Sequence, residues 1–463
     1  MSFLIVLGAL LLLMFVAYRG LSVILFAPVC ALLAVLLTDP SLVPPMFTGV
    51  FMEKMAGFFK LYFPVFLLGA VFGKVIELSG FSQSIVSKVI ALIGRERAML
   101  SIVLVCAVLT YGGVSVFVVV FAVYPFAAEM FRQSGIPKRL IPGTIALGSF
   151  SFTMDSLPGT PQIQNIIPTT FFKTDTWAAP WLGVVGSIFM LLVGMAYLGW
   201  RRRQAAARGE DYGSNHVNEP EPVSTEKLPN FYIAVLPLLV VGIMNKVFTS
   251  VIPAVYGKVH TATVAGHGKP LTTEIDKVVA IWAVEAALLL GILTVLVFAF
   301  KPVKARFADG TKAAIAGSML AAVNTASEYG FGGVIAALPG FLYITEALKA
   351  IPNPLINEAI TVNVLAGITG SASGGMSIAL AAMADTFIAH ANAAGIPLEV
   401  LHRVASMASG GMDTLPHNGA VITLLAVTGL THKTSYGDIF AVTLIKFVAV
   451  FVIIAFYYLT GIY

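Results

Sequence analysis

Met-Asp-Ser-Leu-Pro at residues 154–158 returns as Met-Asp-Thr-Leu-Pro at residues 412–416, and both copies lie within hydrophobic stretches. A second match precedes each copy, because Ser-Gly-Ile-Pro at 134–137 corresponds to Ala-Gly-Ile-Pro at 394–397. The two halves of the chain are therefore interpreted as diverged copies of one unit. A duplicated segment that breaks a helix and carries a carboxylate within a hydrophobic region is typical of the binding site of a membrane transporter.

The composition indicates a membrane protein. Of the 463 residues, 58% are hydrophobic and only 11% are charged, whereas soluble globular domains carry about 25% charged residues. Apolar runs close to the length of a spanning helix recur along the chain. Because backbone polar groups must find partners within lipid, these runs predict an all-α polytopic membrane protein. The net charge of +5 is attributed to loop residues that orient the helices, and no nucleic-acid partner is expected.

Helix breaks and polar stretches divide the chain into five parts. These are N-terminal scaffold helices (1–56), a first repeat (57–200), a cytoplasmic linker (201–228), two further scaffold helices (229–300) and a second repeat (311–463). Each repeat is expected to contain a re-entrant hairpin (98–130 and 355–390) followed by a discontinuous helix (139–175 and 400–430). Within these parts, 39–56 and 248–275 are expected to be loops, and the glycines of 330–333 are expected to interrupt a helix.

The distribution of basic residues predicts the orientation. An outside N-terminus places most lysines and arginines in inside loops, as the positive-inside rule requires, and assigns Arg403 to the outside. The same arrangement makes the first hairpin enter from the cytoplasm and the second from the outside. The two repeats are therefore predicted to have inverted topology, which is common among secondary transporters.

The hairpin tips repeat together with the broken helices. A shift of 258 positions superposes Tyr-Gly-Gly-Val-Ser at 111–115 on Thr-Gly-Ser-Ala-Ser at 369–373 and also superposes the two Met-Asp motifs. Half-helix N-termini and backbone exposed at glycine bind carboxylates, and hydroxyl or amide groups add hydrogen bonds. The predicted substrate-binding residues are Gly112, Gly113, Ser115, Ser156, Thr160, Gly370, Ser371, Ser373, Thr414, His417 and Asn418.

Acidic residues at membrane depth predict ion coupling. Asp155 and Asp413 could each take up a proton or bind Na⁺, and the alternative is that each caps the following half-helix. Asn324 and Glu328 lie four residues apart on one helical face, where Glu328 is a candidate proton relay or a structural hydrogen-bonding group. Neither a phosphate-binding motif nor a Cys/His cluster with metal-ligand spacing is present in the sequence, so no cofactor beyond the coupling ion is expected.

Other charged or titratable residues are given ordinary structural interpretations. Lys74 and Glu77 are expected to form an internal pair, and Lys446 is expected to snorkel to the membrane surface. Glu358 and Asp385 lie towards hairpin ends and are interpreted as surface residues. His417 either titrates near neutral pH or is an ordinary loop residue.

The two Met-Asp breaks, the hairpin tips and Glu-Tyr-Gly-Phe-Gly-Gly at 328–333 resemble the gluconate permease (GntP) family of the ion-transporter superfamily, over nearly the whole chain except 201–228. The stretch 151–162 is most similar to the D-β-hydroxybutyrate permease subgroup. The resemblance implies proton-coupled symport of a small hydroxy-carboxylate across a bacterial inner membrane. It also implies a homodimer in which a transport domain moves against a scaffold in an elevator-like cycle.

One departure from the family bears on the substrate. Gluconate-type members carry Ser-His-Val-Asn-Asp-Ser where this chain reads Met-Asp-Thr-Leu-Pro-His-Asn-Gly at 412–419. This difference favours a smaller monocarboxylate such as 3-hydroxybutyrate. The alternatives are a Na⁺-coupled carboxylate or gluconate-like sugar-acid symporter, a passive channel, and an intramembrane aspartyl protease with an Asp155–Asp413 dyad. A Gly-x-Gly-Asp pattern is expected of such a protease, whereas residues 410–413 read Gly-Gly-Met-Asp. A non-enzymatic function is therefore preferred.

Overall fold

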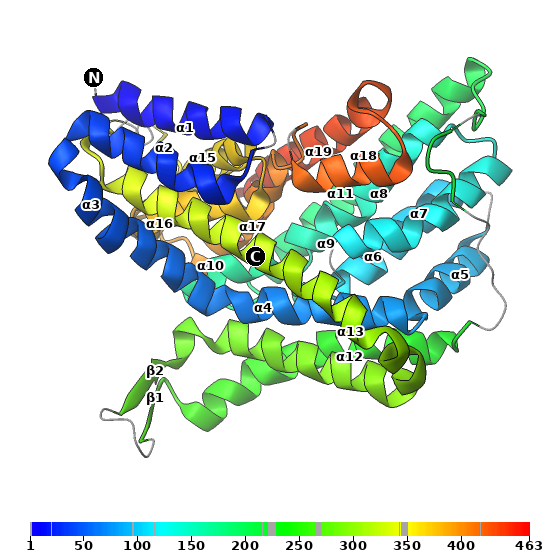
Figure 1. Ribbon diagram of the computed structural model, residues 1–463, viewed down its shortest axis with the longest axis horizontal. Helices are drawn as coiled ribbons and strands as arrows, with labels where there is room; N and C mark the ends of the chain where they lie inside the picture. The colour runs from blue at the N-terminus through cyan, green and yellow to red at the C-terminus, as the bar shows by residue number, and fades with distance from the viewer. Residues whose placement is uncertain are drawn as a thin grey trace.

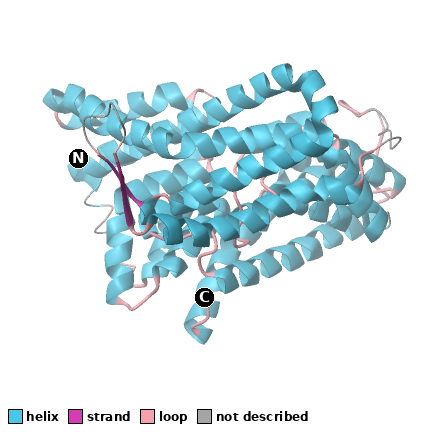
Figure 2. Cartoon of the chain, turned by 90° about the horizontal axis from the view of Figure 1, so that it is seen from below, coloured by secondary structure: helices cyan, strands magenta, loops and turns pink. Residues whose placement is uncertain are grey.

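The computed structural model describes residues 2–19, 21–94, 97–114, 116–214, 216–220, 228–263, 270–341, 343, 351–416 and 418–463. These residues are mostly helical, as Figure 1 shows. Among them, six helical stretches are long and apolar enough to cross a membrane: Pro40–Leu78, Pro180–Ala207, Phe231–Tyr256, Val279–Ala337, Ala372–Ala393 and His432–Thr460. The chain is therefore a polytopic helical membrane protein. The exception to the all-helical prediction is a short antiparallel pair, β1 (Val259–Ala262) and β2 (Leu271–Glu274), which Figure 2 shows in magenta.

The N-terminal part is helical where a loop was expected. After α1 (Ser2–Tyr18) and α2 (Val23–Thr38), η1 (Pro40–Leu42), α3 (Val43–Pro45) and η2 (Met46–Phe51) lead directly into α4 (Met52–Leu78). The prediction of a loop at 39–56 is therefore wrong. The prolines that suggested the loop lie in the first turns of η1 and α3, where a missing backbone N–H costs nothing. The Asp39 side chain caps this start by accepting a hydrogen bond from the Ser41 backbone N–H.

A long helix, α13 (Val279–Ala337), packs along both α4 and α12 (Phe231–Tyr256), as Figure 1 shows. It bends at Ala299, whose backbone is non-helical and which lies three residues before Pro302. The segment 330–333 does not interrupt the helix. Its glycines instead allow close packing, because a Cβ at Gly330 would lie 2.9 Å from the Phe51 carbonyl oxygen and one at Gly332 would lie 2.9 Å from Ile378 Cα.

In both repeats a helical hairpin is followed by a broken helix and then by a long helix. The first comprises α5 (Phe81–Ile93), the hairpin α6 (Ala98–Tyr111) and α7 (Val116–Gln133), then the broken segment and α11. The broken segment runs through η4 (Lys138–Leu140), α8 (Ile141–Ser149), α9 (Phe152–Asp155) and α10 (Ile163–Phe172) to α11 (Pro180–Ala207). The second comprises the hairpin α15 (Pro354–Thr369) and α16 (Ala372–Ala393), the broken pair α17 (Leu398–Gly411) and α18 (Gly419–Thr428), and α19 (His432–Thr460).

The hairpins lie at opposite ends of α19, as inverted repeats require. Asp438, near the start of α19, forms an ion pair of 3.6 Å with Arg139, which follows the open end of the first hairpin. Tyr458, near the end of α19, interacts through its side chain with Asn353, which caps the start of the second hairpin. A helix of 29 residues is about 43 Å long, enough to span a bilayer. The hairpins therefore enter from opposite membrane faces.

The described part of the linker packs against the first repeat. Glu219 accepts a 2.8 Å ion-pair contact from Lys138 and a hydrogen bond of 2.9 Å from Tyr212, and it also pairs with Arg132. Asn218 donates a hydrogen bond to the Ala426 carbonyl oxygen in α18. The interactions of Glu219 and Asn218 bind this segment to the end of the first hairpin and to α18.

We expect Glu219→Gln to loosen this segment. Although partial burial acts to raise the pKa of Glu219, the hydrogen bonds from Lys138, Tyr212 and Arg132 hold it below the ordinary value of 4.5. A lowered pKa stabilises the docked state above pH 4.5, and this stabilisation is lost as the pH falls through the folded value. Limited proteolysis at neutral pH should cut the linker faster in the variant than in the wild type. Glu274→Gln, on the β-hairpin, is the control, and equal cleavage rates in the two variants would contradict the prediction.

Candidate functional site

The two aspartates of the repeated motif meet around a lysine. Asp413, which follows α17, forms an ion pair of 2.6 Å between its Oδ1 and Lys446 Nζ. Lys446 lies in α19 and is 1% exposed, and it also donates to the Phe150 carbonyl oxygen at 2.7 Å. The expectation that Lys446 snorkels is therefore wrong, because a buried carboxylate and a carbonyl freed at the first helix break together bind its ammonium group.

Asp155, at the end of α9, lies beside this pair with a free carboxylate. The residue is 1% exposed, and neither side-chain oxygen has a hydrogen-bonding partner among the described residues. Its Oδ2 contacts Gly410 so closely that a Cβ there would overlap it, and the same Cβ would lie 3.2 Å from Lys446 Cε. Asp155 and Lys446 thus pack against one glycine of α17. One carboxylate from each repeat lies beside a shared cation.

Arg403 is a second buried cation in this region. Its guanidinium donates to the Ala178 carbonyl oxygen at 2.8 Å, to the Asn165 Oδ1 at 3.0 Å and to the Asp155 carbonyl oxygen at 3.4 Å. Arg403 was counted among the outside residues, but it lies inside α17 and is fully buried. The five N–H donors of arginine match several carbonyls at once, as a broken helix requires.

Asn165 and His402 extend this polar network. Asn165, in α10, donates to the carbonyl oxygens of Thr160 at 3.0 Å and Thr176 at 2.8 Å. His402 lies between the Asn165 Oδ1, at 3.1 Å, and the Thr174 hydroxyl, at 2.6 Å. The loop of the first broken helix is therefore held by α17 of the other repeat.

Four predicted binding residues of the broken helices make hydrogen bonds within the protein, and three of their partners lie in neighbouring elements. Ser156 Oγ donates to the Gly183 carbonyl oxygen at 2.9 Å, and Thr160 Oγ1 donates to the Thr153 carbonyl oxygen at 2.8 Å. The Thr414 and Thr443 hydroxyls are hydrogen bonded to each other. Asn418 Nδ2 donates to the Gly370 carbonyl oxygen at 2.7 Å and its Oδ1 caps α18. These side chains shape the breaks.

The tip of the first hairpin contacts the broken helix of the same repeat. Gly113 has φ of +94°, which favours glycine. Gly112 and Gly113 leave room for Leu238 and Pro161, respectively. Tyr111 donates to the Pro158 carbonyl oxygen at 2.9 Å. Ser115 lies outside the described residues.

The tip of the second hairpin carries a cluster of hydroxyl groups. Gly370 has φ of +65°, and Ser371 caps α16 by accepting from the Gly374 N–H at 3.1 Å. Ser373 Oγ lies 3.3 Å from Thr325 Oγ1 in α13 and 3.5 Å from Ser371 Oγ. The predicted hydroxyl donors of this hairpin thus lie together at the N-terminus of α16. His417 lies outside the described residues.

Glu328 faces the same hairpin tip from α13. It is buried, its Oε2 has no hydrogen-bonding partner among the described residues, and it contacts Gly374 so closely that a Cβ there would overlap it. Asn324 is partly buried one turn earlier. Glu328 is therefore adjacent to the serine cluster, on a different helix from Asp155.

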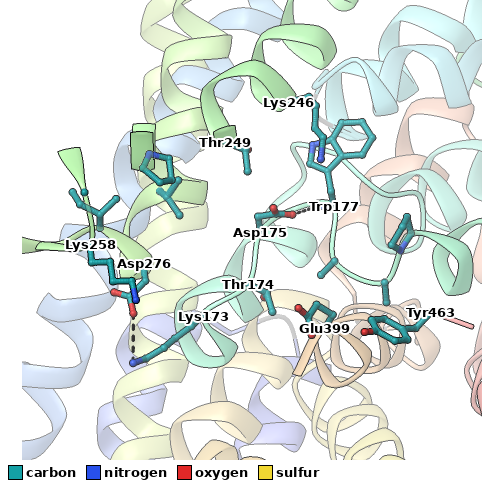
Figure 3. Close-up of a pocket in the computed structure, with 17 residues that line it drawn as sticks. Lys173, Thr174, Asp175, Trp177, Lys246, Thr249, Lys258, Asp276, Glu399 and Tyr463 are labelled. Atoms are coloured by element: carbon teal, nitrogen blue, oxygen red, sulfur yellow. Dashed lines mark hydrogen bonds and ion pairs between the residues drawn. The ribbon is translucent and has the colours of Figure 1, made fainter. Parts of the chain in front are cut away.

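A cavity of about 710 Å³ lies elsewhere, between the loop before α11 and the end of α12. Figure 3 shows Lys246 beside Trp177 and the ion pair of Lys173 with Asp276. None of the predicted site residues lines this cavity, but Ala178 in its wall accepts the hydrogen bond from Arg403. Within the described ranges, no group of three or more His, Cys, Asp or Glu residues could hold a metal ion.

Comparison with known proteins identifies the class. No family model matches the chain. Two solved transporters share the fold: YdaH of Alcanivorax borkumensis (TM-score 0.51, 16% identity, 92% of this chain and 90% of that one) and MtrF of Neisseria gonorrhoeae (TM-score 0.53, 14% identity, 87% and 82%). MtrF is described as one of a class of antimetabolite efflux pumps. The uncharacterized transporter YxjC of Bacillus subtilis is 58% identical over 470 residues, with both chains covered completely. The chain therefore belongs to the same family of membrane transporters as YxjC.

Proposed function

We propose that this transporter is a proton-coupled symporter of a short hydroxy-monocarboxylate such as 3-hydroxybutyrate. The observation that carries the proposal is the unpartnered Asp155 carboxylate beside the Asp413–Lys446 pair. The sequence resemblance to the GntP family, with its D-β-hydroxybutyrate permease subgroup, supports the substrate class. The dyad of a protease is not favoured, because Asp413 pairs with Lys446.

The charges of the site suit this coupling. Two acids, Asp155 and Asp413, share the region with two bases, Lys446 and Arg403, so the four groups balance when all are ionised. Protonation of Asp155 leaves one uncompensated positive charge in a buried site, where charge imbalance is costly. A bound monocarboxylate restores the balance. Proton binding therefore favours anion binding at the same site, which is the thermodynamic requirement of symport.

The hairpin tips supply hydrogen-bond donors for such an anion. The serine cluster at the start of α16, with the positive end of that helix, suits a carboxylate or hydroxyl group. We further propose that the hairpins and broken helices form a transport domain that moves against α4, α12 and α13. We also propose that the protein forms a homodimer and that it resides in a bacterial inner membrane.

Reconstitution in liposomes tests the function. Uptake of labelled 3-hydroxybutyrate is measured under an imposed pH gradient and, separately, under a Na⁺ gradient, with gluconate and lactate as competitors. A gradient of one pH unit stores about 1.4 kcal/mol per proton, which supports about tenfold accumulation at one proton per substrate. We expect accumulation under the pH gradient, little competition from gluconate, and loss of accumulation in Asp155→Asn.

Three outcomes would contradict parts of the proposal. Accumulation driven by Na⁺ alone would replace the proton with Na⁺ as the coupling ion. Strong competition by gluconate would favour a sugar-acid substrate. Downhill flux without accumulation under either gradient would indicate a passive channel.

A further inference from the structure

The second hairpin contains a buried carboxyl group that the proposed site does not use. Glu358 lies in α15, is 0% exposed, and has no hydrogen-bonding partner for either oxygen among the described residues. Its interpretation as a surface residue is therefore wrong. Among the described residues, no charged group contributes to the electrostatic surroundings of Glu358, although α1, α16, α17 and α19 all pack against α15.

Comparison of the two hairpins shows that a hairpin of this fold forms without an acidic residue at the position of Glu358. The shift of 258 positions that superposes the hairpin tips places Glu358 on Leu100 of α6. Three further buried polar residues of α15 likewise replace apolar residues of α6: Asn357 replaces Met99, Thr361 replaces Val103 and Asn363 replaces Val105. One hairpin therefore carries a series of polar groups at positions where its equivalent carries apolar residues.

The polar groups of α15 extend from the open end of the hairpin towards the region of Asp155 and Asp413. Glu358 lies within two turns of the start of α15, at the end next to Tyr458. Asn363 contacts Gly411, where a Cβ would overlap its Oδ1, and Gly411 is two residues before Asp413. The Asn363 Oδ1 also has no hydrogen-bonding partner among the described residues. In the orientation predicted from the basic residues, Glu358 is thus on the outer side of the Asp155 site.

We propose that Glu358 is a second proton-binding site, which takes up the proton on the outer side before it is used at Asp155. A buried carboxylate without a counter-charge or hydrogen bonds is too costly to persist, so the group carries a proton in this conformation. To release the proton it must reach water or a polar neighbour, which requires movement of the hairpin. Glu358 therefore couples its own protonation to hairpin position. This proposal rests on proton symport as the function.

The protonation state is tested without any substrate. Infrared difference spectra of the purified protein at neutral pH are recorded for wild type and Glu358→Gln. We expect the wild-type spectrum to contain a protonated-carboxyl C=O band, shifted in D₂O, that the variant lacks. A carboxylate band in its place would overturn the proposal, even if proton symport itself holds.

The role in coupling is tested in liposomes. In Glu358→Gln, accumulation under a gradient of one pH unit should fall from about tenfold to about equal concentrations, while exchange of labelled for unlabelled substrate continues. Glu358→Leu, which copies the first hairpin, should behave in the same way, whereas a merely structural role predicts that one of the two accumulates normally. Asp385→Asn, an exposed acid on α16, is the matched control. Wild-type accumulation in both Glu358 variants would overturn the proposal. Absence of accumulation by the wild type would instead contradict the proposed function.

Discussion

Replacing Lys446 with methionine is expected to destabilise the protein by about 3–5 kcal/mol and to abolish transport. Lys446 is the ion-pair partner of Asp413 and donates to the Phe150 carbonyl oxygen. Methionine fills a similar volume but leaves the Asp413 carboxylate buried without a counter-charge. Asp155 and Lys446 both pack against Gly410. The substitution therefore also removes the cation nearest to the Asp155 carboxylate.

A double variant separates the charge from the packing. Lys446→Met combined with Asp413→Leu removes both members of the pair, and an apolar replacement of a buried pair is often neutral for stability. We therefore expect thermal unfolding in detergent to show recovery of stability but not of transport. Lys74→Met is the control, because its 2.7 Å pair with Glu77 is partly exposed and such pairs contribute about 0–1 kcal/mol. A double variant no more stable than Lys446→Met would contradict this account.

Replacing Arg403 with lysine is expected to cost about 2–5 kcal/mol of stability and most of the transport activity, although the charge is retained. The guanidinium binds three acceptors at the same time: one terminal nitrogen donates to Asn165 and Asp155, and the other donates to Ala178. An ammonium group cannot reproduce this planar set of donors. The loop of the first broken helix should therefore loosen, and Asp155 should lose its fixed position.

Two measurements check this prediction. Thermal unfolding reports the stability, and reaction of a cysteine introduced at Ala178 with a thiol reagent reports the loop. The reagent should react faster in the Arg403→Lys background than in the wild type. Arg208→Lys, a largely exposed arginine after α11, should leave both measurements unchanged. Unaltered stability and reactivity in Arg403→Lys would show that the hydrogen bonds of this side chain do not hold the loop.

Local backbone preferences made the main breaks visible in the sequence. Gly113 and Gly370 adopt positive φ, which explains why glycine marks the tips of both hairpins in the repeated text. Proline and glycine were misleading elsewhere, because the same residues also start helices, as at Pro40, or allow close helix packing, as at Gly332. Sequence alone does not distinguish these uses of glycine and proline, since they depend on which helix lies opposite.

The repeated motif also indicated that Asp155 and Asp413 belong to one region, whereas their basic partners were missed. A single lysine in an apolar helix has the same sequence pattern whether it snorkels or pairs, and Lys446 pairs with a residue 33 positions away. Arg403 binds residues more than 200 positions away. Such partners follow from tertiary packing. A charge surrounded by apolar residues indicates that the group needs a partner or water, but it does not identify which.

The position of Gly410 against Asp155 has a consequence for the ancestry of the chain. A protein made of the first repeat alone would contain Asp155 but neither Lys446 nor Arg403, which both belong to the second repeat. An antiparallel pair of identical halves would carry the same side chain at each equivalent position, so it could not place a lysine or an arginine on one side only. A centre with both cations on one side, and a difference such as Leu100 against Glu358, therefore require two copies of the sequence that have diverged.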